Sequence, residues 1–191
     1  MTIRFSRDMG VLAVVPLGPI GEMAVRITAA NLQAVLEIPV DILPAAALPA
    51  HAYEPTRRQY DAGRLLEDLV RICPGGYGKV LGVAAADLCI PILTYVFGEA
   101  QLGGKAALVS GWRLRGAPSG AAVPLDHYYE RLAKVALHEV AHTLSLYHCE
   151  EPGCLMNFSP TLDDLDRLNL MFCERCRFSL RDNPWRLREV P

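Results

Sequence analysis

The sequence predicts an α/β fold in which a five-stranded, mostly parallel sheet packs against helices and a small cysteine-rich segment follows. Short apolar runs bounded by proline and glycine alternate with helical patterns in the first half of the chain. Four cysteines then cluster after residue 148. The length of 191 residues suits one good core. We therefore expect a single domain over residues 1–191, divided into subdomains 1–148 and 149–191.

Five runs have the length and composition of strands. Most are continuously apolar, as expected for strands that are covered on both faces of a sheet. The runs are Val11–Val15, Val40–Leu43, Lys79–Ala84, Thr94–Phe97 and Ala106–Val109. The fourth run lies between a proline and a glycine, so we expect it at the edge of the sheet.

Four segments have helical patterns, with apolar residues three and four apart and capping residues or prolines at their ends. They are Gly21–Glu37, Asp61–Cys73, Asp126–Ser145 and Asp163–Met171. Asp61 and Thr161 are suited to cap the second and the fourth. The third carries apolar residues on more than one side, which predicts a helix enclosed by the rest of the protein.

The composition excludes several classes of protein. Hydrophobic residues make up 51% of the chain and charged residues 21%, which is ordinary for a globular domain and excludes wholesale disorder. The formal net charge of -2 provides no basic field, so we expect no nucleic-acid partner. The longest apolar runs are broken by prolines, so we expect no membrane span.

The N-terminal residues do not read as an export signal. Arg4 and Arg7 precede the apolar run Val11–Val15, but that run is short, meets Pro16 and Pro19, and is not followed by a small-residue cleavage site. We therefore expect a cytoplasmic protein. In that compartment paired cysteines hold metal more often than they form disulfides.

A first metal site is predicted around three histidines. His138 and His142 are four residues apart, so on a helix they project from one face, about 6 Å apart at Cβ. A third ligand must come from beyond the helix, and His148 is well placed if the chain turns after His142. Three imidazoles around zinc leave the fourth position for water, which is the arrangement of a catalytic zinc.

Glu139 directly follows the first histidine and is expected beside the water without binding the metal. It would take the proton of a zinc-bound water and pass it to a leaving amine, a chemistry that hydrolyses peptide bonds. A His-Glu-x-x-His sequence also arises by chance, and two such histidines can be purely structural. A non-catalytic zinc-binding or regulatory protein with a blocked cleft therefore stays as the alternative function.

A second metal site is predicted from two cysteine pairs, Cys149-x4-Cys154 and Cys173-x2-Cys176. Four thiolates close the coordination shell of zinc, so this site would be structural. Two disulfides or inert thiols are the alternatives. Cys73 and Cys89 lie outside the pattern and are expected in the core. Because Cys149 follows His148 directly, the two sites are covalently adjacent.

One block of residues resembles the archaemetzincins, a family of zinc metallopeptidases within the metzincins: His138-Glu139-x-x-His142-x-x-Ser145-x-x-His148-Cys149-x4-Cys154-x-Met156, then Cys173-x-x-Cys176. The stretch Tyr95-Val96-Phe97-Gly98-Glu99-Ala100 is also similar to that family. The resemblance implies a metzincin-like twisted, mixed sheet with one antiparallel edge strand, above a small zinc-stapled C-terminal subdomain. It also implies that the edge strand, here Thr94–Phe97, borders the cleft and can pair with an extended substrate.

The resemblance further implies a peptidase, and we expect it to bind two zinc ions, one catalytic and one structural. We also expect a monomer that acts on a peptide or unfolded polypeptide. Met156 matches the methionine of the Met-turn, a tight turn beneath the metal. The family usually has glycine where this chain has Ser145. Glycine suits a sharp exit from a helix with positive φ. Either the serine adopts that conformation at a cost of about 1–2 kcal/mol, or the turn has another geometry.

Overall fold

The computed structural model describes residues 10–116 and 121–183. Arg4, Arg7 and the outer ends of the two predicted subdomains lie outside these residues. The helices are α1 (Glu22–Leu36), α2 (Ala62–Ile72), α3 (Leu125–Thr143), α4 (Leu162–Asp166) and α5 (Glu174–Arg181). The strands are β1 (Leu12–Leu17), β2 (Val40–Ile42), β3 (Tyr53–Glu54), β4 (Gln59–Asp61), β5 (Lys79–Ala84), β6 (Leu88–Ile90), β7 (Leu93–Val96), β8 (Gly98–Ala100) and β9 (Ala106–Ser110).

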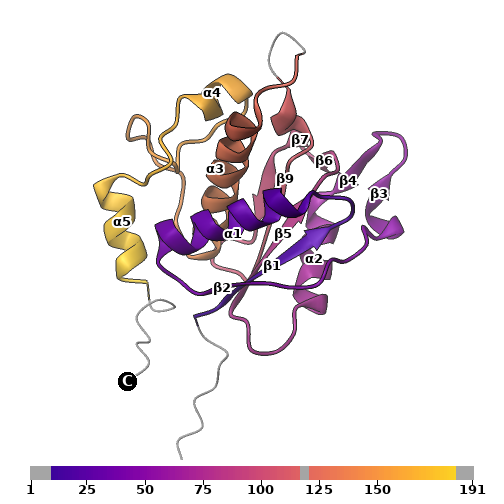
Figure 1. Ribbon diagram of the computed structural model, residues 1–191, viewed down its shortest axis with the longest axis horizontal. Coiled ribbons are helices and arrows are strands. Elements are labelled where there is room, and N and C mark those ends of the chain that lie inside the picture. The colour runs from indigo at the N-terminus through magenta and orange to yellow at the C-terminus, as the bar shows by residue number, and fades with distance from the viewer. Residues whose placement is uncertain (1–9, 117–120, 184–191) are drawn as a thin grey trace, which may run out of the picture.

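The main sheet has five strands in the order β2-β1-β5-β9-β8. The first four are parallel to one another, and β8 pairs antiparallel with β9 at the edge. In Figure 1, α1 and α3 lie in front of this sheet, and α5 lies to the left of α3. The α/β class and the mixed five-stranded sheet predicted from the sequence are confirmed.

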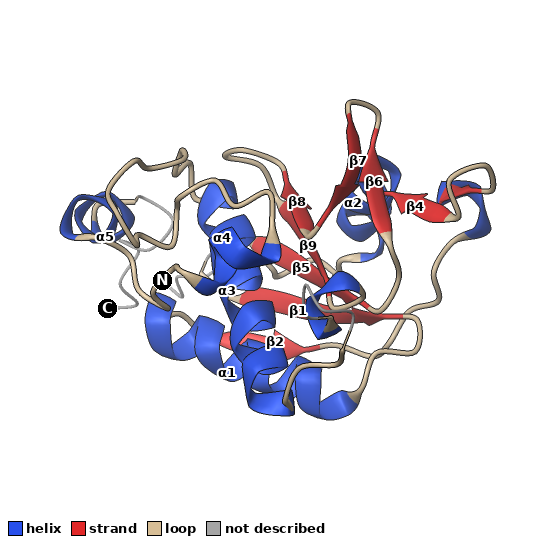
Figure 2. Cartoon of the chain, turned by 90° about the horizontal axis from the view of Figure 1, so that it is seen from above, coloured by secondary structure: helices blue, strands red, loops and turns tan. Residues whose placement is uncertain are grey.

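The identity of the edge strand was predicted wrongly. The run Thr94–Phe97 does not join the main sheet, because most of it forms β7, which pairs with β6 in a second sheet of order β3-β4-β6-β7. Figure 2 shows this hairpin standing away from the larger sheet. The antiparallel edge of the main sheet is Gly98–Ala100 instead, because the chain passes from one sheet to the other at Phe97. β7 is still an edge strand, but of the smaller sheet.

Successive side chains of a strand point to opposite faces of the main sheet, and both faces are buried. In β1, Leu12 and Val14 belong to the core shared with α1 and α3, whereas Ala13 and Val15 belong to the core shared with α2. This two-sided burial explains why the strands are continuously apolar in sequence. Within the described part of the chain, no helix is long and apolar enough to cross a membrane.

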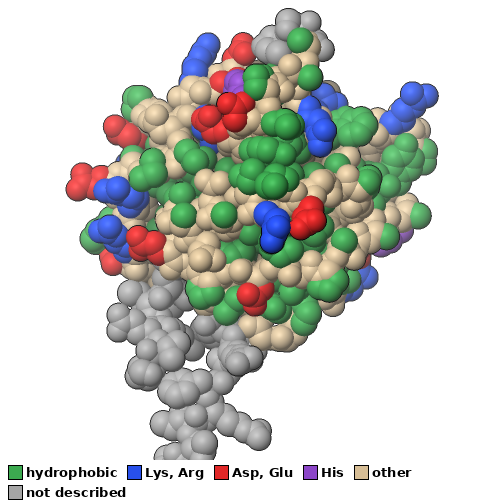
Figure 3. All heavy atoms as spheres, viewed as in Figure 1, with side chains coloured by type: hydrophobic (Ala, Val, Ile, Leu, Met, Phe, Trp, Pro, Cys, Tyr) green, Lys and Arg blue, Asp and Glu red, His purple; other side chains and the backbone are tan. Residues whose placement is uncertain are grey.

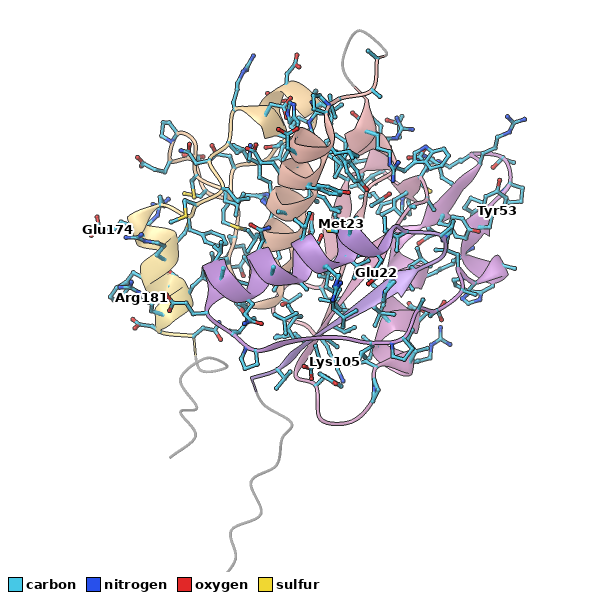
Figure 4. All side chains as sticks on the ribbon, in the orientation of Figure 1. Glu22, Met23, Tyr53, Lys105, Glu174 and Arg181 are labelled. Atoms are coloured by element: carbon cyan, nitrogen blue, oxygen red, sulfur yellow. The ribbon has the colours of Figure 1, made fainter. Side chains whose placement is uncertain are left out.

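The outer face of α1 is open to solvent. Glu22 pairs with Arg26 at 3.5 Å, and Met23 is 56% exposed; Figure 4 labels Glu22 and Met23 at this surface. On the same face of the molecule, charges of both signs lie scattered among hydrophobic side chains (Figure 3). Exposed ion pairs contribute little to stability, so α1 is held mainly by its buried side.

The C-terminal segment departs from the sequence prediction in two places. The helix that starts after the Thr161 cap ends at Asp166 and not near Met171. Beyond it the backbone pairs with the cysteine loop, since the amide of Asn169 bonds to the Gly153 carbonyl and the amide of Leu155 to the Met171 carbonyl. The helix α5 was not predicted, because few of its residues are apolar and buried.

A buried ion pair ties α4 to α3. Arg131 is 1% exposed and donates two hydrogen bonds to the Asp166 carboxylate, at 2.7 and 2.6 Å. Its remaining terminal nitrogen donates to the carbonyls of Leu114 and Gly116. The hydrogen bonds that Arg131 donates to the carboxylate are the main reason why the pKa of Asp166 is lowered to about 2.

The contribution of this pair should depend on pH. Because the folded pKa of Asp166 lies below its ordinary value, the stabilisation is complete above about pH 4 and is lost as the pH falls through about 2. Urea unfolding of the wild type and of Asp166→Asn should differ by roughly 1 kcal/mol near neutral pH, after allowance for solvent screening, and should converge near pH 2. A difference that stays constant over the whole range would contradict the assignment.

Candidate metal centre and cleft

The three histidines predicted as ligands meet in space. The helix α3 presents His138 and His142 on one face, with 3.0 Å between their Nε2 atoms. His148 arrives from the chain beyond the helix, and its ring centroid lies 5.2 Å from that of His138 and 4.8 Å from that of His142. One ligand atom from each of the three lies within 4.8 Å of the others. The spacing fits a single metal ion.

Backbone carbonyls set the orientation of two of these rings. Nδ1 of His138 lies 2.8 Å from the Leu155 carbonyl oxygen, and Nδ1 of His142 lies 2.7 Å from that of Leu146. A carbonyl oxygen only accepts, so each Nδ1 carries the proton and each Nε2 offers its lone pair. Burial lowers the pKa of His138 to about 3 and also lowers that of His142. Both rings are therefore neutral, as metal binding requires.

The sharp turn after α3 delivers the third histidine. Ser145 has a φ of 66°, in the left-handed region. The amide of Ser145 bonds to the His142 carbonyl and that of Leu146 to the Ala141 carbonyl, which is the hydrogen-bond pattern of a Schellman motif. Lys79 supports the helix end, because its Nζ donates to the carbonyls of Thr143 and Gly104 at 2.6 Å each. Of the two alternatives that the sequence left open, the structure has the serine in the left-handed conformation.

Ser145→Gly should stabilise the protein by about 0.5–1 kcal/mol. Glycine removes the steric cost of a left-handed residue, about 1–2 kcal/mol. Part of this gain is offset because glycine loses more conformational entropy on folding than serine does. Ser145 is exposed, so its replacement leaves no cavity. Chemical denaturation measures the change, and Ser145→Ala serves as the control, since it keeps Cβ and should give no gain. A clear loss of stability in Ser145→Gly would contradict this account.

Glu139 lies buried beside the histidines, against the edge strand. A Cβ built on Gly98 would come within 2.6 Å of Glu139 Cγ, so only a residue without a side chain lets β8 approach this closely. Burial, and secondly the nearby charge of Glu99, raise the pKa of Glu139 well above its ordinary value. Both carboxyl groups line the same cavity as the histidines.

This cavity has a volume of about 570 Å³ and lies between the two sheets' edge strands and the C-terminal segment. Strands β7 and β8 form one wall, and part of the other wall is Asn157–Pro160. The Tyr95 hydroxyl donates to the Pro160 carbonyl at 3.1 Å, which links the two walls. The histidines lie in the lining, so a ligand in the cavity has access to the metal centre.

The four cysteines predicted as a second site also come together. Sγ of Cys149 lies 3.8 Å from that of Cys173, and Sγ of Cys154 lies 3.9 Å from that of Cys176. These distances are far too long for disulfides. They match the edge of a thiolate tetrahedron around zinc, about 3.8 Å for bonds of 2.3 Å. Cys73 and Cys89 are buried elsewhere, as expected.

The segment between the two cysteine pairs contains a tight turn. The amide of Asn157 bonds to the Cys154 carbonyl, which closes the turn around Leu155 and fully buried Met156. The same turn supplies the Leu155 carbonyl that orients His138. Asn157 also donates from its side chain to the Cys149 carbonyl, so the turn and the cysteine loop hold each other.

Several groups at the metal centre and in the cavity lining escaped the sequence prediction. The carbonyls of Leu146 and Leu155 carry no signal in side-chain identity. Lys134 lies four residues before His138 and shares its helix face, but it could not be told from a solvent-exposed lysine. Glu99 belongs to the stretch that resembles the family, without a role assigned to it.

The fold, with its His-Glu-x-x-His helix and a third histidine beyond a turn, defines the protein as a zinc metallopeptidase. The family model described as Peptidase family M54 matches residues 25–182. The chain belongs to this family, the archaemetzincins.

Individual relatives are similar over most of their length. The archaemetzincin of Methanopyrus kandleri is 41% identical over 138 residues, which cover 72% of this chain and 75% of that protein. The archaemetzincin of Archaeoglobus fulgidus is 37% identical over 158 residues, which cover 82% and 91%. The crystal structure of the M. kandleri archaemetzincin superposes with a TM-score of 0.81 at 35% identity, covering 95% of this chain and 98% of that chain.

Proposed function

We propose that the protein hydrolyses peptide bonds with Glu139 as the general base. In this proposal His138, His142 and His148 hold a catalytic zinc ion, and Cys149, Cys154, Cys173 and Cys176 hold a structural one. The observation that carries the proposal is the meeting of three histidine ligands and one buried carboxylate in the lining of a single cavity.

A zinc ion held by the three histidines would polarise a substrate carbonyl and lower the pKa of a water molecule to about 7. Glu139 accepts the proton of the attacking water and delivers it to the amine nitrogen as the C–N bond breaks. Burial raises the pKa of Glu139, which makes its carboxylate a stronger base than that of an exposed glutamate. The buried surroundings keep bulk water away from this transfer.

The edge strands offer a place for the substrate backbone. Both β7 and β8 are edge strands, and both line the cavity. An extended peptide could add to either one by main-chain hydrogen bonds. We assign this role to β8, because Gly98 and Glu99 bring it directly against Glu139.

The second zinc would hold the C-terminal subdomain, which we place at residues 149–191, against the N-terminal subdomain of residues 1–148. Met156 would fill the space beneath the metal centre without binding the ion. The alternative function, a non-catalytic zinc protein, is favoured by one observation, the Tyr95–Pro160 hydrogen bond that joins the walls of the cleft.

Metal analysis combined with a peptide-library cleavage assay distinguishes the two functions. We expect two zinc ions per chain and cleavage that is lost on chelation and restored by added zinc. Two zinc ions without cleavage of any peptide would instead favour the non-catalytic alternative.

A further inference from the structure

A buried lysine faces the proposed active-site cavity. Lys134 is only 2% exposed and lies on α3, one turn before His138 and on the same face. It lines the cavity together with His138 and Glu139. Among the described residues that line this cavity, it is the only lysine or arginine.

The surroundings of Lys134 are largely apolar, so its charge acts more strongly on nearby groups than the same charge would in water. The cavity is also lined by apolar residues of α3, α4, the segment that follows α4 and the tight turn, among them Val135, Leu155, Leu165 and Leu168. Because Lys134 is only 2% exposed, its charge acts on a ligand through a lower dielectric than a charge at the surface does. A carboxylate entering the cavity would meet a cation that is poorly solvated.

Two other buried cations show what a purely structural role looks like in this fold. Lys79 donates to the Thr143 carbonyl at the end of α3 and to the Gly104 carbonyl between β8 and β9, and it does not line the cavity. Arg131 donates hydrogen bonds to the Asp166 carboxylate and to the carbonyls of Leu114 and Gly116. In both cases the acceptors are groups of the protein itself, and the hydrogen bonds hold elements of the fold together.

Lys134 differs from these two residues in having a single partner among the described residues. Its Nζ pairs with the Glu130 carboxylate at 2.7 Å, and no second partner is found for it among the described residues. The Glu130 side chain is 51% exposed, so it lies at the surface and is a weak, solvated counter-ion. An ammonium group has three N–H donors, which leaves capacity for a second acceptor on the cavity side.

We propose that Lys134 is a specificity-determining residue, and that the subsite beside His138 takes a carboxylate of the substrate. This inference deepens the proposed function and rests on it. The carboxylate has two sources, an aspartate or glutamate side chain next to the scissile bond or the C-terminus of a short peptide. Either would pair with the Lys134 ammonium while the peptide bond lies over the histidine site.

Binding to an inactive protein tests this without cleavage. Zinc-loaded Glu139→Gln is titrated with pairs of peptides that differ only in Glu against Gln, or in a free against an amidated C-terminus. The acidic or free-ended member should bind about tenfold more tightly, the effect of one charge-assisted hydrogen bond. The pair that shows the difference identifies the source of the carboxylate. Adding Lys134→Met should remove the difference, and adding Lys134→Arg should keep most of it.

The matched control is Lys105→Met, which removes the same charge from a residue outside the cavity lining, at the lower edge of the molecule in Figure 4. It should leave the preference intact. Glu130→Gln gives a second test that keeps Lys134, because losing the competing carboxylate should enlarge the preference for the acidic peptide.

The outcomes separate this inference from the proposed function. Equal binding of both members of every pair would overturn the role of Lys134, even if the wild type cleaves peptides. A preference that persists in Lys134→Met, or falls in Glu130→Gln, would also overturn it. A Lys134-dependent preference in a protein that cleaves nothing would support the subsite while the proposed function fails.

Discussion

Glu139→Gln is expected to reduce peptide cleavage by about a thousandfold or more, with both metal sites still filled. The amide has nearly the shape of the carboxylate, so the close contact with Gly98 is preserved. It cannot accept a proton, however, and the attacking water and the leaving amine both lose their partner. The measurement is kcat/KM on the best library peptide, combined with zinc content and thermal unfolding.

A matched control is Glu99→Gln, the other carboxyl group in the cavity lining. It removes a charge close to Glu139 but leaves the base in place, so its effect on kcat should be much smaller. If Glu139→Gln kept full cleavage with intact zinc, another group would have to move the proton and the proposed mechanism would be wrong.

The double variant Cys173→Ser/Cys176→Ser is expected to lose one zinc ion per chain and to weaken the other site by about 10- to 100-fold. Structural zinc contributes on the order of 10 kcal/mol to the folding of small cysteine-rich segments. His148 is bonded directly to Cys149, and the Leu155 carbonyl that orients His138 lies within the same segment. Loosening this segment therefore disturbs two of the three histidines.

Competition with a chelator measures the affinity of the remaining site. Cys73→Ser/Cys89→Ser is the matched control, because it replaces two buried cysteines outside the cluster and should leave both zinc ions bound. Unchanged affinity of the histidine site in Cys173→Ser/Cys176→Ser would show that the two sites are independent.

The fold class and the clustering of the candidate ligands could be predicted from the sequence because both depend on local rules. Residues four apart lie on one face of a helix, so the spacing of His138 and His142 predicts that they meet. Continuous apolar runs predict strands that are covered on both faces of a sheet. A sharp turn after His142 could be predicted because the third histidine must return to the first two. The φ of Ser145 could not, because a serine in place of the usual glycine left two turn geometries open.

Other features depend on tertiary contacts that no local pattern contains. Gly98–Ala100 is a poor strand by composition, and it becomes the edge of the main sheet because β9 and Glu139 hold it there. The fourth helix stops at Asp166 because its next residues find backbone partners in the cysteine loop. Lys134 is buried by helices and loops that come from distant parts of the chain.

The carbonyls of Leu146 and Leu155 place a limit on what mutational scanning can detect. They orient His142 and His138, yet no amino-acid substitution deletes a main-chain oxygen. Both residues are buried, and Leu155 also lines the cavity, so their replacement would change packing together with any effect on the metal centre. The residues whose carbonyls orient the two histidines would therefore resemble ordinary buried hydrophobic positions in such a scan. An amide-to-ester exchange at the following residue, which weakens the carbonyl as an acceptor, would reveal them.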